Sequence, residues 1–155
     1  MKTPKLQKID FNNRKKEFEV SYKGGKKVAL HYGQLGIRSN LVHAGIDTDS
    51  NGIAFFYETE SGEKDFVPYD IPLILTKDPD YLFQSEIEEL IADIHKNMKA
   101  KGISKKFLAR SLETSDIQVE RLLNPENPNK NFVQLNKIAH ILGLNLKIQL
   151  EEEVA

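Results

Sequence analysis

The chain has no cysteine among its 155 residues. This absence excludes disulfide bonds, thiolate zinc sites and cysteine nucleophiles, and it is typical of a reducing compartment. No apolar run approaches the roughly 18 residues that a membrane-spanning helix needs, and the opening MKTPKLQKIDF lacks the apolar core of a signal peptide. We therefore expect a soluble cytoplasmic protein.

Signals for metal, phosphate or catalytic chemistry are equally scarce. The four histidines show no metal-ligand spacing, and the nine glycines form no phosphate-binding pattern. The segment DTDSNGIAFFYE (47–58) matches much of an EF-hand calcium loop, but such a loop needs a helix on either side, and GIAFFYE is typical of a strand. Residues 47–52 therefore predict a hairpin turn. We expect no metal, no cofactor and no enzymatic activity.

The first seventy residues alternate between apolar and polar side chains. Four strands are predicted at residues 17–22, 26–32, 52–58 and 64–69, and Gly24-Gly25, Ser50-Asn51-Gly52 and Ser61-Gly62 supply the turns. The segment 32–46 is left open, with a helical turn as one option. The pattern predicts a small antiparallel meander in an α+β domain over residues 1–76.

The net charge of −1 hides an uneven distribution along the chain. Residues 77–95 hold one basic and six acidic side chains, whereas residues 96–147 hold ten basic and four acidic ones. Attraction to a polyanion acts over about 8 Å at physiological salt, so a local excess matters more than the total. The C-terminal half therefore carries a basic block.

From Asp78 onward the apolar residues recur every three or four positions, which is typical of helices. A helix is predicted to start at Asp78-Pro79, with Ser85 and Glu88 as a second possible start, and to stop at Gly102. Further helices are predicted at 104–112, 115–123 and from Asn131 to Leu142. We expect these side chains to point inward: Phe107, Leu108 and Leu112 in the second helix, and Phe132, Leu135, Ile138, Ala139 and Leu142 in the last.

The segments GISKKFLARSL, TSDIQVERLL and NFVQLNKIAHILGL lie within residues 85–144, which resemble the DNA-binding domain of lambda-repressor-like, or Xre-type, transcriptional regulators. Ala109 stands where that family has a small residue at the crossing of two helices. Two positions depart from the family: Lys105 replaces a glutamine, and Glu113 replaces the glycine of the turn. The resemblance implies a helix-turn-helix regulator of bacterial or phage type that binds double-stranded DNA.

The order of the two halves carries a second resemblance. The segment 61–82, which opens with SGEKDFVPYDIPL and ends with DPDYL, and the layout around it look like a group of uncharacterised bacterial proteins, in which a small α+β domain of unknown role precedes an Xre-like domain. This resemblance implies no activity for the front half. We expect the front domain to serve assembly or sensing.

A helix beginning at Ser115 would bury Val119, Leu122 and Leu123 and expose its other face. Of that face, we expect Gln118 to pair with adenine, Arg121 with guanine or phosphate, and Asp116 with cytosine. Glu120 would oppose DNA unless it pairs with Arg121 or Lys105. The predicted DNA-binding set is Lys105, Lys106, Ser115, Asp116, Gln118, Arg121 and Lys130, with the three lysines on phosphates.

The alternative left open is a helix-turn-helix-shaped adaptor that binds protein, such as the antitoxin partner of a toxin. The segment LNLKIQLEE (144–152) alternates and predicts a strand, which closes a second domain over residues 77–155. A lone strand needs a partner, either in the front sheet or in another copy. We favour a homodimer, because such proteins gain affinity by spanning two half-sites about 34 Å apart.

Overall fold

A computed structural model describes residues 4–153 of the chain. Two compact units divide between Leu82 and Phe83, and each is described by itself. The first unit is built mainly of strands and the second of helices, so the predicted α+β class is confirmed. Residues 1–3 and 154–155, which the predicted domains include, lie outside the described residues.

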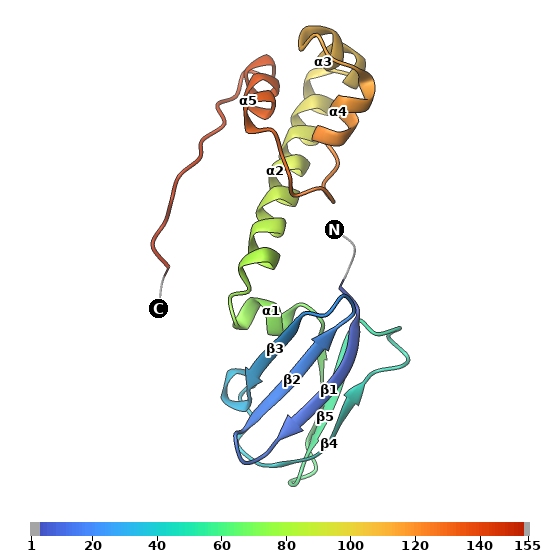
Figure 1. Ribbon diagram of the computed structural model, residues 1–155, viewed down its shortest axis with the longest axis vertical. Helices are drawn as coiled ribbons and strands as arrows, with labels where there is room; N and C mark the ends of the chain where they lie inside the picture. The colour runs from blue at the N-terminus through green and yellow to red at the C-terminus, as the bar shows by residue number, and fades with distance from the viewer. Residues whose placement is uncertain (1–3, 154–155) are drawn as a thin grey trace. The chain divides into compact units, whose positions relative to one another are not determined.

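The first unit holds two antiparallel three-stranded sheets (Figure 1). One contains β1 (Leu6–Asn12), β2 (Glu17–Tyr22) and β3 (Lys27–His31), and the other contains β4 (Leu41–Ile46), β5 (Ala54–Thr59) and β6 (Lys64–Pro68). A 3₁₀ turn η1 (Tyr32–Leu35) connects them, and α1 (Ile71–Leu75) follows β6. The four predicted strands are confirmed, whereas β1 and β4 were not predicted and the expected meander is divided into two sheets.

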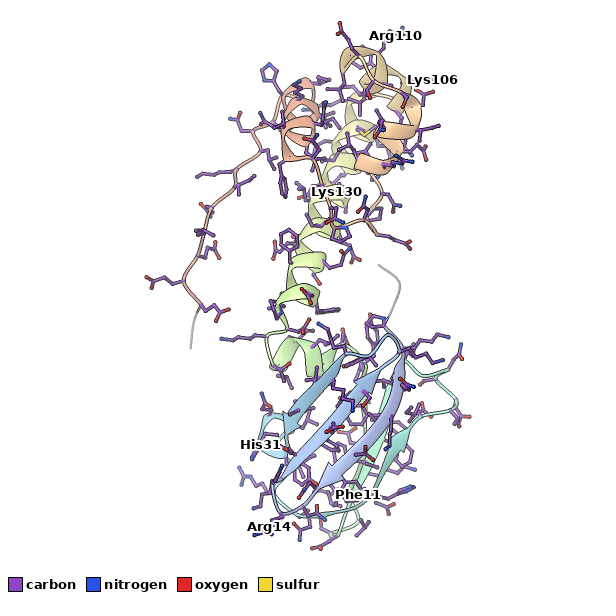
Figure 2. The ribbon with its side chains drawn as sticks, in the orientation of Figure 1. Phe11, Arg14, His31, Lys106, Arg110 and Lys130 are labelled. Atoms are coloured by element: carbon purple, nitrogen blue, oxygen red, sulfur yellow. The ribbon has the colours of Figure 1, made fainter. Side chains whose placement is uncertain are left out.

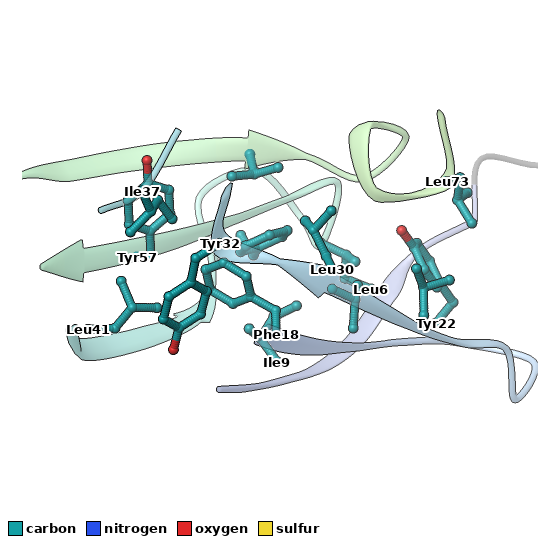
Figure 3. Close-up of a cluster of buried hydrophobic side chains, with 14 residues drawn as sticks. Leu6, Ile9, Phe18, Tyr22, Leu30, Tyr32, Ile37, Leu41, Tyr57 and Leu73 are labelled. Atoms are coloured by element: carbon teal, nitrogen blue, oxygen red, sulfur yellow. The ribbon is translucent and has the colours of Figure 1, made fainter. Parts of the chain in front are cut away.

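The two sheets share one apolar core (Figure 3). Phe18 of β2 and Phe55 of β5 are fully buried, and their ring centroids lie 5.4 Å apart in an edge-on arrangement. Tyr32 from η1 packs on Phe18 at 5.1 Å, and its hydroxyl donates to Asn13 Oδ1 at 2.9 Å. Aromatic pairs in this geometry stabilise a core beyond the area that they bury. The 3₁₀ turn therefore serves as part of the packing between the sheets.

The segment that resembles a calcium loop is a β-hairpin connection. It joins β4 to β5, Asn51 and Gly52 adopt left-handed angles of 57° and 80°, and the Ser50 hydroxyl donates to the carbonyl oxygen of Asp47. Glu58 lies on β5 and not at the start of a helix. The predicted hairpin turn is confirmed.

The second unit is helical. Its helices are α2 (Pro79–Lys101), which begins in the first unit, α3 (Lys105–Ser111), α4 (Asp116–Leu122) and α5 (Phe132–Ile141). All four follow the predicted positions. The core joins Ile91 and Ile94 of α2 to Leu108, Val119 and Ile138, one from each of the other helices. Among the described helices, none is both long and apolar enough to cross a membrane.

Residues 144–153 form no strand within the single chain, because no strand of the described residues pairs with them, and the expected pairing with another copy stays a prediction. The expected inward packing of two phenylalanines is wrong. Phe107 and Phe132 are 49% and 37% exposed, although both were expected to point inward. Each phenylalanine lies in the first turn of its helix, Phe107 in α3 and Phe132 in α5. The inward-facing positions are occupied by residues one to three places later, such as Leu108 and Leu135.

Asp78 anchors the start of α2. One carboxylate oxygen accepts from the backbone N–H of Tyr81 at 2.9 Å, and both accept from the Lys26 ammonium at 2.7 and 2.8 Å. Pro79 takes the first helical position, as predicted. Burial alone would raise the pKa of Asp78, but the hydrogen bonds from Lys26 and Tyr81 outweigh it and hold that pKa below its ordinary value of 3.8.

A depressed carboxyl pKa makes stability depend on pH. The ionised Asp78 carboxylate contributes to the free energy of unfolding. This contribution is fully present above the unfolded-state pKa and is lost as the pH falls through the lower folded-state pKa. We expect Asp78→Asn, which keeps a capping oxygen but loses the charge, to flatten the loss of stability below about pH 4, as measured by urea unfolding. Asp80→Asn is the matched control, because Asp80 is 87% exposed and bonds Lys26 at 3.2 Å. Equal acid profiles for wild type and Asp78→Asn would contradict this account.

Candidate nucleic-acid interface

The turn between α3 and α4 sets the direction of the second helix. Glu113, which stands where the resembled family has the glycine of the turn, adopts a left-handed φ of 54°. The amide of Thr114 donates to the carbonyl of Ala109 at 2.9 Å, which closes α3 with the bond pattern of a helix C-terminus. Ser115 then caps α4, since its hydroxyl accepts from the amide of Gln118 at 3.2 Å. Ser115 thus acts first as a helix cap.

Close approach of α3 to its neighbours depends on Ala109. Its side chain is 4% exposed and lies in the helical core beside Leu108. A larger side chain at a packed crossing forces neighbours apart. This matches the expectation that a small residue is needed where the two helices meet.

One face of α4 is buried and the other is open. Val119 and Leu123 are buried in the core and Leu122 is half-buried. The exposed face carries five side chains: Asp116, Ile117, Gln118, Glu120 and Arg121. It presents an amide, a guanidinium and a carboxylate next to one another, which are the groups that read base edges in a major groove.

Glu120 is paired with Lys105. Its carboxylate accepts from the Lys105 ammonium at 3.0 Å, and the two side chains are 63% and 42% exposed. The pair joins the first turn of α3 to the middle of α4. This is one of the two pairings under which Glu120 was expected not to oppose DNA. Lys105 is consequently held by a carboxylate, which reduces the charge it offers to a phosphate.

Lys130 lies beyond the C-terminal end of α4. Its ammonium donates to the carbonyl oxygens of Arg121 at 3.1 Å and Asn124 at 2.5 Å. A cation here stabilises the negative end of the helix. Burial lowers the pKa of Lys130 from its ordinary value. An ammonium has three donors, so one remains for a phosphate after both carbonyls are satisfied.

Lys106 and Arg110 provide the exposed positive charge of α3 (Figure 2). They stand four residues apart, so they are neighbours on one face of the helix. Arg110 is absent from the set of DNA-binding residues predicted from the sequence. Its spacing from Lys106 was the signal that could have included it.

A groove of about 660 Å³ lies against this surface. Among the side chains that line it are Lys105, Asp116, Ile117, Glu120, Arg121 and His95 of α2. The His95 ring is 3.1 Å from the carbonyl oxygen of Leu123 and thereby joins α2 to the end of α4. Ile117 is 65% exposed at its edge. An exposed isoleucine beside polar readers suits contact with a thymine methyl group, and the predicted set omitted it.

No metal site is evident in residues 4–153, where no three histidine, aspartate or glutamate side chains come together as ligands. The groups that could act at this surface are hydrogen-bond donors and acceptors, cations and two exposed apolar side chains.

Comparison with known families agrees with this geometry. Residues 93–147 match the model of the Cro/C1-type HTH DNA-binding domain. The match begins within α2 and includes α3, α4 and α5. The C-terminal half therefore contains a helix-turn-helix domain of the Cro/C1 type, as the resemblance implied. No curated protein and no solved structure matches the chain.

The left-handed angle at Glu113 yields a prediction about stability. A residue with a Cβ pays about 1–2 kcal/mol in this conformation and glycine pays none of it. We expect Glu113→Gly to raise the free energy of unfolding by about 1 kcal/mol in urea titrations, after the greater chain entropy of unfolded glycine is subtracted. Glu113→Ala is the control, because it removes the charge and keeps the strain. A loss of stability in Glu113→Gly would contradict the assigned turn.

Proposed function

We propose that this chain is a sequence-specific, DNA-binding transcriptional regulator of the Xre type that acts as a homodimer. The observation that carries the proposal is the open face of α4, where Gln118 and Arg121 project beside the cations of α3. A matching Cro/C1-type domain supports DNA binding. The proposal assigns the chain no catalytic step.

In this proposal the side chains divide into two groups. Gln118 pairs with adenine and Arg121 with guanine, both through two hydrogen bonds in the major groove, while Asp116 accepts from cytosine N4 and Ile117 touches a thymine methyl. Lys106 and Arg110 hold phosphates, with Lys105 and Lys130 as secondary contacts because each already has protein partners.

The electrostatic balance supports a modest affinity for phosphate. Asp116 lies in the first turn of α4, where the helix dipole favours a negative charge, and Glu120 is neutralised by Lys105. The unpaired excess on this surface therefore comes from Lys106, Arg110 and Arg121. Phosphate contacts from Lys106 and Arg110 alone would give a salt slope of about −1.8, so binding should be tight only at low salt or with two copies.

A second candidate function is protein binding by the same surface, as in an adaptor or an antitoxin-like partner of a toxin. The observation that favours it is the pair of exposed apolar side chains Phe107 and Ile117, at 49% and 65%. Aromatic and aliphatic anchors of this kind form the centre of protein interfaces. The two candidates differ in how they depend on charge.

A gel shift with the upstream region of the gene, repeated across a salt series, tests the proposal. We expect Lys106→Glu to weaken binding on every sequence and to flatten the salt slope, because it removes a phosphate contact. Gln118→Ala and Arg121→Ala should each cost about 1–3 kcal/mol on the preferred site and less on unrelated DNA. Lys27→Glu, at an exposed position of β3 in the first unit, is the matched control for charge.

Glu120→Gln is expected to change DNA affinity in the opposite direction. It releases Lys105 and removes a negative charge, so it should raise DNA affinity and steepen the salt slope. If folded protein fails to shift DNA at low salt, or if Lys106→Glu leaves binding intact, the regulator is ruled out. Retention of a protein partner by the double variant Lys105→Glu and Lys106→Glu would then support the adaptor.

A further inference from the structure

The C-terminal segment 144–153 forms no strand with any other part of residues 4–153, and its backbone is tied at the start, where the amide of Leu144 donates to the carbonyl oxygen of Ala139 at 2.8 Å. Its apolar side chains alternate with polar ones, and Leu146 packs against the helical core. Farther along, Ile148 is 68% exposed and Leu150 is fully exposed. A segment with strand periodicity, an anchored start and unpaired backbone groups is suited to pairing with another strand.

The edges of the front sheets are poor partners for it. Strand β1 lies beside β4, and β3 packs with α1 and η1. At β6 the amide of Phe66 donates to its neighbour Asp65 Oδ1 at 2.8 Å, and Pro68 has no N–H to offer. Such features protect a sheet edge from an added strand. The remaining candidate is the same segment of a second copy.

We propose that residues 145–153 of two copies pair as an antiparallel two-stranded ribbon whose two-fold axis passes through Gln149. In this register Gln149 faces its own counterpart, Lys147 faces Glu151, and Ile148 faces Leu150. Each of the last two pairs occurs twice by symmetry. Cross-strand pairs of opposite charge and of apolar side chains are the units that stabilise such a ribbon.

Charge complementarity selects this register. A shift by one residue sets Ile148 opposite a polar side chain, since directly opposed residues share a face. A shift by two residues in one direction sets Lys147 opposite Gln149 and loses both ion pairs. A shift by two in the other direction sets Ile148 opposite Glu152. Of these registers, only the axis at Gln149 pairs Lys147 with a carboxylate and Ile148 with Leu150, while Leu146, which packs against its own helical core, stands opposite Glu152.

A groove with an apolar wall lies beside this segment. Its volume is about 540 Å³, and its apolar lining comes from Phe83, Ile87 and Leu90 of α2, Phe132 of α5, and Leu146 and Ile148 of the segment itself. The polar lining is Glu86, Lys147, Gln149 and Glu151. Because Leu150 of the second copy faces Ile148, its side chain reaches this groove. Pairing therefore covers Leu150, which is fully exposed in the single chain. It also covers the apolar wall of the groove, where Phe83 is 49% and Phe132 37% exposed.

This inference rests on the proposed function in expecting a dimer, and it deepens that function by naming the surface that forms it. The test uses the cysteine-free full chain without DNA, so its failure is distinguishable from a failure of DNA binding. We expect Gln149→Cys to form a disulfide-linked dimer under mild oxidation, because the two sulfur atoms meet at the axis. Lys147→Cys is the control, since its counterpart lies four residues along the ribbon, about 13 Å away.

Charge exchange gives a second readout that does not depend on cysteine. Lys147→Glu should weaken the dimer by roughly 2- to 30-fold, since two cross-strand ion pairs become repulsive, and adding Glu151→Lys should restore it. Sedimentation equilibrium measures both. Equal cross-linking at positions 147 and 149, preferred cross-linking at Ile148→Cys, or no rescue by the exchanged pair would overturn the register. A chain that stays monomeric at high concentration would overturn the ribbon itself.

Discussion

The tight turn between α3 and α4 is the constraint on which the recognition surface depends. Glu113 holds a left-handed backbone angle, the amide of Thr114 closes α3 on Ala109, and Ser115 opens α4 with its hydroxyl. These local bonds fix the rotation of α4 about its own axis. Val119 is therefore buried in the core, and the side chains on the opposite face of α4, such as Gln118 and Arg121, point outward.

Electrostatics then decides how strongly that surface attracts a polyanion. The chain as a whole is nearly neutral, and only the cations left unpaired on α3 and α4 count. The Lys105–Glu120 pair neutralises one cation and one anion of this surface. The Lys130 ammonium uses two of its donors on carbonyl oxygens near the end of α4. A surface with few free charges favours binding that depends on base contacts and on two copies acting together.

Sequence periodicity predicted α2 to α5, their caps and four of the six strands, because those features follow from neighbouring residues alone, but it did not predict α1. It missed β1 and β4 for a shared reason: each contains a register shift, between Leu6 and Lys8 and between Leu41 and His43. A bulge breaks the strict alternation on which strand prediction depends. For the site, it predicted which residues α4 exposes, but not that Lys130 reaches two carbonyls across the following loop, since that contact depends on loop geometry.

The central claim is that DNA contacts the exposed faces of α3 and α4. Amide chemical-shift mapping by NMR tests it most directly, with the full chain titrated by a DNA duplex at low salt. The account predicts perturbations concentrated at residues 105–121, with the largest in the first turn of α4. Perturbations concentrated on the strands of the first unit would contradict it. So would the absence of perturbations when the concentrations of folded protein and duplex both exceed the midpoint concentration of the gel shift.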